Sequence, residues 1–175
     1  MKITTAADGT KKFELFVGKG GADQIKSYIN FAFEHELGEI VKDDLRVQGK
    51  ILSQTEIAAK VDSLNLAGET KDELLGLIEH RLFADKISLK TRPELLGEWK
   101  IENTELLSHF EDLYQKGEYH LLNSELTHLS YLKSLHLKDP AINRQLEEIV
   151  GRLTPTSKKQ FNDLMNLMEE VTTNV

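Results

Sequence analysis

The sequence contains no cysteine and only three prolines among its 175 residues. Without cysteine the chain cannot form disulfides, use a thiolate nucleophile or bind zinc through sulfur, which fits either a reducing compartment or a lineage that uses little cysteine. Few prolines leave little room for disordered linkers, so we expect the whole chain to fold. No run approaches the roughly 20 apolar residues of a membrane span, and the start of the chain lacks the apolar core of a signal peptide. We therefore expect a cytoplasmic protein with no membrane contact.

Acidic residues are in excess, and the excess lies in the second half of the chain. The formal net charge is -7, residues 1–50 are balanced, and residues 101–175 hold seven Lys or Arg against twelve Asp or Glu. This charge disfavours non-specific binding to nucleic acid or anionic lipid. It suits solubility or a basic protein partner.

The first residues predict a β-hairpin followed by a glycine-rich turn. Residues 3–17 read as two short extended segments around Asp8-Gly9, a pair that favours a tight primed turn. Residues 18–21, Gly-Lys-Gly-Gly, then open directly into a helix. A strand, a glycine-rich turn and a helix start can cradle an anion, although the spacing matches neither a Walker loop nor a dinucleotide fingerprint. A plain connector is the alternative.

Residues 23–43 predict a helix with one broad apolar face. That face holds Ile25, Tyr28, Ile29, Ala32, Phe33, Leu37, Ile40 and Val41. Phe31 lies away from it and is a candidate anchor of a protein interface, with a satellite core contact as the alternative. Gly38, in the helix interior, indicates close packing or a bend.

The middle of the chain resembles a winged-helix domain. After the helix at 23–43, a strand is expected at 45–52, helices begin at the capping boxes Ser53 to Glu56 and Thr70 to Glu73, and strands are expected at 86–90 and 98–102. This order over residues 23–102 is similar to that of winged-helix proteins, and SQTEIAAKV resembles the first helix of a helix-turn-helix unit. The resemblance implies that residues 71–83 would enter the major groove.

The candidate nucleic-acid contacts in that alternative are Lys71, Arg81 and Arg92. The same surface also carries Asp72, Glu73 and Glu79, whose charges oppose the neutralisation of phosphates. We therefore expect the resemblance to be one of topology, and nucleic acid to be a disfavoured partner.

The second half predicts an antiparallel helical bundle over residues 103–175. The helix at 118–137 is apolar over more than half of its circumference, which is typical of a helix enclosed by several neighbours. Glu125, Lys133 and His136 interrupt its leucine arc and are candidate interface residues. Leu167, at one side of the last helix, is another.

Glu125 and His128 form a Glu-x-x-His pair, half of a carboxylate-bridged metal site. A full site needs a second pair, and no other histidine has a glutamate three positions before it. A Glu-x-x-His pair more often marks a local contact within a helix than a metal site, so we expect no metal and no cofactor. No spacing of Ser, His and acid indicates a hydrolase, and we name no catalytic residue.

The sequence therefore predicts a mainly α protein of the α+β class, with a mixed region at 1–102 and a helical bundle at 103–175. We expect a non-enzymatic, cytoplasmic protein–protein interaction module that acts as a regulator, inhibitor or adaptor. It would form a homodimer through its C-terminal helices. A winged-helix transcriptional regulator is the alternative, and a metal-dependent enzyme is the third.

Overall fold

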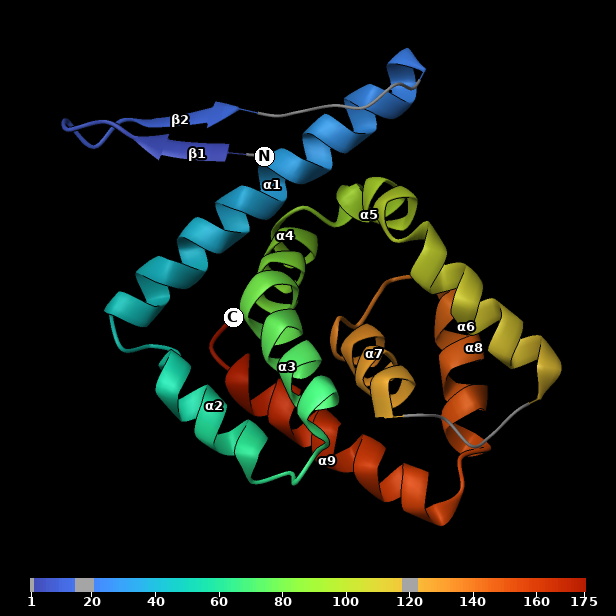
Figure 1. The fold of residues 1–175 in the computed structure, drawn as a ribbon. Helices are drawn as coiled ribbons and strands as arrows, with labels where there is room; N and C mark the ends of the chain where they lie inside the picture. Colours follow the sequence, from blue (N-terminus) through green and yellow to red (C-terminus); the bar gives the residue numbers. More distant parts are fainter. Residues whose placement is uncertain (1, 15–20, 118–122) are drawn as a thin grey trace.

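A computed structural model describes residues 2–14, 21–117 and 123–175, and within these ranges the protein is mostly helical (Figure 1). The mainly α prediction is confirmed. No helix in these ranges is both long enough and apolar enough to span a bilayer. The elements are β1 (Lys2–Thr5), β2 (Lys11–Glu14), α1 (Ala22–Val47), α2 (Gln54–Asp62), α3 (Gly68–Leu77), the π-helical turn η1 (Ile78–Leu82), α4 (Phe83–Thr91), the 3-10 turn η2 (Pro93–Leu95), α5 (Leu96–Glu102), α6 (Thr104–Lys116), α7 (Asn123–Ser134), α8 (Pro140–Gly151) and α9 (Pro155–Val171).

The N-terminal hairpin is present, with a longer turn than the sequence predicts. β1 and β2 pair antiparallel with Thr5 opposite Lys11, so residues 6–10 form the connection in place of a two-residue turn. Gly9 has a φ of +84°, a conformation that favours glycine. Figure 1 shows the hairpin beyond α1, away from the other helices. The predicted glycine-rich turn falls on residues 18–21, of which 18–20 lie outside the described residues.

The winged-helix prediction finds no support, because each of its three strands is wrong. Residues 45–52 form the end of α1 and a loop, while 86–90 lie in α4 and 98–102 in α5. The helices α3, η1 and α4 follow one another without a break from Gly68 to Thr91. Leu74, Ile78 and Leu82 are all buried at steps of four residues, and the helix continues through 86–90, where Ile87 and Ser88 are buried.

Of the two capping boxes that the sequence predicts, one forms and the other does not. Ser53 forms the predicted capping box, since its side chain accepts from the amide of Glu56 and the Glu56 carboxylate accepts from the amide of Ser53. The box predicted at Thr70 does not form, because α3 begins two residues earlier and Thr70 is buried.

The helices enclose α7, as predicted for the helix at 118–137, which ends at Ser134 and of which residues 118–122 lie outside the described residues. α7 packs against α9, α3 and α8, while α6 packs against α8 and α1 lies along α4 and α5. Leu126, Leu129 and Leu132 are buried, and so are the polar residues Thr127 and Ser130 on the other side of α7. The buried apolar cluster joins residues from both halves of the chain.

Candidate functional site

Helix α1 lies with its inner face on α4, and the two backbones approach closely at Gly38. A Cβ built on Gly38 would lie 2.8 Å from the carbonyl oxygen of Ala84. The Ser88 hydroxyl donates to the carbonyl of Glu34 over 3.0 Å, next to this contact. Close packing at Gly38 is thus confirmed, and it fixes which face of α1 points inward.

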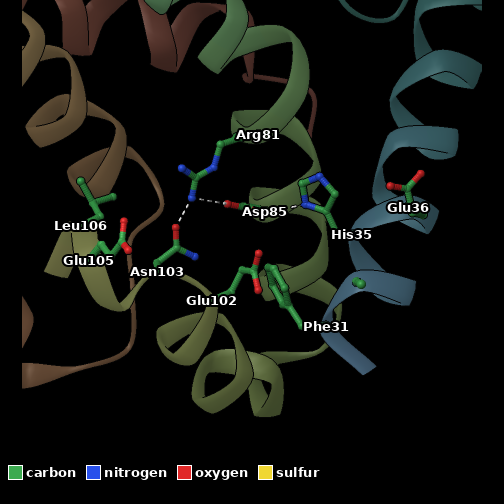
Figure 2. A pocket seen from close by; sticks show the side chains of 10 residues that line it. Phe31, His35, Glu36, Arg81, Asp85, Glu102, Asn103, Glu105 and Leu106 are labelled. Carbon is green, nitrogen blue, oxygen red and sulfur yellow. Dashed lines mark hydrogen bonds and ion pairs between the residues drawn. The ribbon is translucent and has the colours of Figure 1, made fainter. Parts of the chain in front are cut away.

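The inner face is anchored by Asp85 of α4, a carboxyl group that is only 1% exposed. Its Oδ1 lies 2.9 Å from Nδ1 of His35, and its Oδ2 accepts from Nε1 of Trp99 over 3.1 Å. The Tyr131 hydroxyl also donates to Oδ2. The Arg81 guanidinium lies 4.0 Å from the same oxygen (Figure 2). One buried carboxyl group therefore connects α1, η1, α5 and α7.

Burial and the charge of Asp85 shift the pKa values of His35 and Tyr131. Burial works to lower the pKa of His35, but the hydrogen bond and charge of Asp85, with the charges of Glu39 and Glu36, outweigh it and raise that pKa above its ordinary value. Burial and then the charge of Asp85 raise the pKa of Tyr131 well above its ordinary value. Tyr131 therefore remains a hydrogen-bond donor, and His35 favours its charged form.

A cavity of about 490 Å³ opens beside this cluster, between α1, η1 and the junction of α5 and α6. Figure 2 shows the side chains of Glu102 and Glu105 at this cavity, with Glu36 on α1. Within the described residues none of these three glutamates forms an ion pair. The cavity is therefore polar and rich in carboxyl groups, and Phe31 gives it an apolar wall.

Further along α1, the inner face carries a second polar network. Lys42 is 4% exposed and donates to the Glu39 carboxylate and to the carbonyl of Glu79. Arg46 donates to both carboxylate oxygens of Glu79, over 3.1 and 3.0 Å. A buried cation is costly unless it is paired, so these contacts are what allow Lys42 to face inward.

The outer face of α1 carries apolar side chains that remain exposed. Ile29, Phe33, Leu37 and Val41, four residues apart, form an outer ridge with exposed fractions of 41%, 46%, 37% and 41%. In the described residues, large apolar side chains that remain this exposed occur only on α1. The sequence predicts these residues as part of the broad apolar face and places Phe31 away from it, but Phe31 is 5% exposed in the core. Phe31 is therefore a core contact, the alternative to an interface anchor, while part of the broad apolar face remains exposed.

The other predicted interface residues are not gathered into one surface. Glu125 lies 3.3 Å from His109, Lys133 lies 3.4 Å from Glu147, and His136 lies 2.9 Å from Glu169. Leu167 is buried in the core. The pairs are local contacts between neighbouring helices.

The metal and nucleic-acid candidates are likewise engaged with other residues. His128 contacts the carbonyl of Ser124 and lies 3.6 Å from Glu73 of α3, whereas Glu125 contacts His109 of α6. No cluster of three or more potential metal ligands occurs in the part of the chain that the structure describes. Ion pairs hold Lys71 to Asp62, Arg81 to Asp85, and Arg92 to Glu34 and Glu94.

Sequence reasoning missed the cluster around Asp85, although one signal for it exists. Asp85 stands in the stretch LFADKISL, where most of the neighbours are apolar. An acid in such a stretch must find partners or stay at the surface. Arg81 is four positions away, but the hydrogen-bonding partners His35, Trp99 and Tyr131 lie from 14 to 50 positions away, so sequence spacing does not reveal them.

Comparisons with protein-family models, with curated proteins and with solved structures find no match for this chain.

Proposed function

We propose that this protein is a non-enzymatic protein–protein interaction module that pairs with a second copy of itself across the outer face of α1. The observation that carries the proposal is the outer ridge of Ile29, Phe33, Leu37 and Val41. A contiguous apolar surface of this kind marks an interaction site more often than scattered apolar residues do. The pair would act as a regulator, inhibitor or adaptor, and the cysteine-free chain fits a cytoplasmic setting.

The ridge is self-complementary when two α1 helices run antiparallel about position 35. Ile29 of one copy then lies opposite Val41 of the other. Phe33 lies opposite Leu37. Ridges formed by residues four apart are also those that pack most often between helices in globular proteins.

The charged residues at the two ends of the ridge support the same orientation. Lys26 and Asp44 are both exposed, and they lie nine positions on either side of position 35. Antiparallel pairing places each Lys26 opposite an Asp44, whereas parallel pairing would place like charges together. A second copy is therefore the occupant that fits this face.

The inner face gives the ridge a rigid support. The contacts of Asp85, Gly38 and Lys42 hold α1 on the body of the protein with its apolar residues outward. A preformed surface loses less entropy on association than one that must be ordered first.

The DNA-binding alternative receives less support, because Lys71, Arg81 and Arg92 each pair with an acid of the same chain. The cavity beside Asp85 holds no group of three or more potential metal ligands among the described residues, and its described lining contains no hydroxyl or amine nucleophile. We therefore do not propose an enzymatic reaction.

Size-exclusion chromatography with light scattering tests the proposal. The chain has a mass of 19.9 kDa, and we expect a mass near twice that value at micromolar concentration, falling on dilution. Leu37→Asp should give the monomer, because it brings a carboxylate from each copy into an apolar contact.

Ala59→Asp is the matched control, since it adds the same charge to an exposed position of α2. It should leave the mass unchanged, and circular dichroism should show that both variants remain folded. A strictly monomeric wild-type protein, or a folded Leu37→Asp variant that stays dimeric, would contradict the proposal.

A further inference from the structure

A second hollow, of about 320 Å³, lies on another side of the molecule. It forms where α4, the start of α5, the segment between α7 and α8, and Val175 meet. Its apolar lining is provided by Leu89, Leu96, Leu135 and Leu137. Leu135 and Leu137 are 6% and 4% exposed, so they form a fixed floor.

The rim of this hollow is basic, in a protein whose net charge is -7. Lys86, Lys90, His136 and Lys138 line it, and no Asp or Glu occurs among its described lining residues. The cavity beside Asp85 has the opposite character, with four carboxyl groups in its lining. The two hollows therefore differ in the charged groups that line them.

The three lysines at the rim differ in the hydrogen bonds and ion pairs that they form with neighbouring residues. Lys86 donates to the Thr172 hydroxyl over 2.7 Å and lies 3.8 Å from Glu169, and burial is the main cause that lowers its pKa. Lys90 donates to the main-chain oxygen of Val175 over 2.7 Å. Lys138 is exposed and forms no ion pair with any residue that the structure describes.

We propose that this hollow binds a small amphiphilic carboxylate, with its hydrocarbon chain against Leu89, Leu96 and Leu137 and its carboxylate at Lys90 and Lys138. An apolar cavity with a few charged groups at one edge is the usual form of a small-molecule site, and about 300 Å³ is the lower end of the usual range. The size therefore favours a ligand of moderate length. The basic rim rejects cationic amphiphiles, and the leucines give no affinity to short anions.

Isothermal titration calorimetry with sodium decanoate, below its critical micelle concentration, tests this proposal with the full chain. We expect saturable binding of one decanoate, with weak or undetectable binding of decyltrimethylammonium and of acetate. Equal binding of the decyl cation would show a merely apolar patch and would overturn the proposal. So would the absence of decanoate binding.

Two sets of variants locate the site. Lys90→Gln combined with Lys138→Gln should weaken decanoate binding about tenfold or more, because hydrogen bonds to charged groups are lost. Lys138→Gln alone should weaken it less while leaving the Lys90 contact with Val175 in place. Lys159→Gln removes a cation from an exposed ion pair on α9 and should have no effect. An equal loss with Lys159→Gln would overturn the assignment.

Filling the hollow gives an independent readout. Leu96 is only partly buried, so Leu96→Trp should fold and block the cavity, which would abolish decanoate binding. Sedimentation with phosphatidylglycerol vesicles distinguishes a free ligand from an anionic membrane surface. Binding to the vesicles that survives Leu96→Trp, without binding of free decanoate, would overturn the proposal.

Discussion

The inner face of α1 carries His35, Lys42 and Arg46 toward the protein, whereas its outer face carries Ile29, Leu37 and Val41 toward solvent. An ordinary surface helix has the opposite arrangement, with apolar residues inward. The two faces also differ in what holds them. The inner face combines directed bonds to particular partners with the buried side chain of Phe31, while the outer ridge consists of exposed apolar side chains between Lys26 and Asp44.

This contrast explains how α1 can be stable in an inverted orientation. Charged groups can face the interior when each finds a partner, as the contacts of Asp85 and Glu79 provide. The four residues of the outer ridge, in contrast, remain 37% to 46% exposed. The inner face therefore holds α1 on the rest of the protein, and we propose that the outer face pairs with a second copy.

Removing the central partner of the inner face should have the largest effect. Asp85→Ala leaves the buried groups of Trp99 and Tyr131 and the half-buried His35 without their acceptor, so we expect a loss of about 3–5 kcal/mol in the free energy of unfolding. Urea denaturation measures this loss. Asp112→Ala, at an exposed position of α6, is the control and should change stability by less than about 0.5 kcal/mol. Similar losses for both variants would contradict the role of Asp85.

Forcing the backbones of α1 and α4 apart at Gly38 should have the next largest effect on stability. Gly38→Ala places a Cβ against the carbonyl oxygen of Ala84, and such overpacking should cost about 1–3 kcal/mol. Gly76→Ala is the matched control, because nothing lies within 4 Å of its Cβ and alanine favours a helix by up to about 1 kcal/mol. Thermal unfolding should move in opposite directions for the two variants. A shift in the same direction would show that Gly38 does not set the approach of α1 to α4.

Reversing the charges at the ends of the ridge should have a smaller effect, and it should change only the association of the two copies. Lys26→Asp should weaken the dimer about two- to tenfold, as exposed ion pairs contribute little. Adding Asp44→Lys to the same chain should restore it, because antiparallel pairing again places opposite charges together. Sedimentation equilibrium at low and high salt checks both results. A double variant weaker than the single one would exclude the antiparallel register.

The pH dependence of the inner face should be the smallest effect. The pKa of His35 is higher in the folded protein than in the unfolded chain, so the stability that its charge contributes is complete below the unfolded pKa of about 6.5 and is lost as pH rises through the folded pKa. The difference in urea midpoint between the wild type and His35→Gln should therefore shrink between pH 5.5 and pH 8. An increase over this interval would contradict the assignment.

Local signals predict several helix ends, although the capping box at Thr70 does not form. Asp139 and Pro140 start α8, Gly117 ends α6 with a φ of +67°, and Ser53 caps α2, as their neighbours in the sequence indicate. Each of these features depends on residues within a few positions. The mainly α character follows from the same periodicity.

The orientation of α1 could not be predicted in this way. Apolar periodicity identifies the face with Ile29 and Leu37, but it cannot show that Asp85 and Glu79 supply partners for the opposite face from 50 and 33 positions away. The strand predicted at 86–90 fails for a related reason, because Ile87 and Leu89 alternate with polar residues while α4 is fixed by its contact with α1. The candidate site is thus determined by long-range contacts.

Cross-linking of single cysteines tests the pairing of outer faces most directly, because the native chain has no cysteine to interfere. A mixture of the Lys26→Cys and Asp44→Cys proteins, treated with a short bismaleimide, should give a covalent heterodimer. Each protein alone should not, since antiparallel pairing separates the two copies of either position by about 27 Å along the helix at 1.5 Å per residue. Efficient linking of either protein to itself, or no linking in the mixture, would contradict the account.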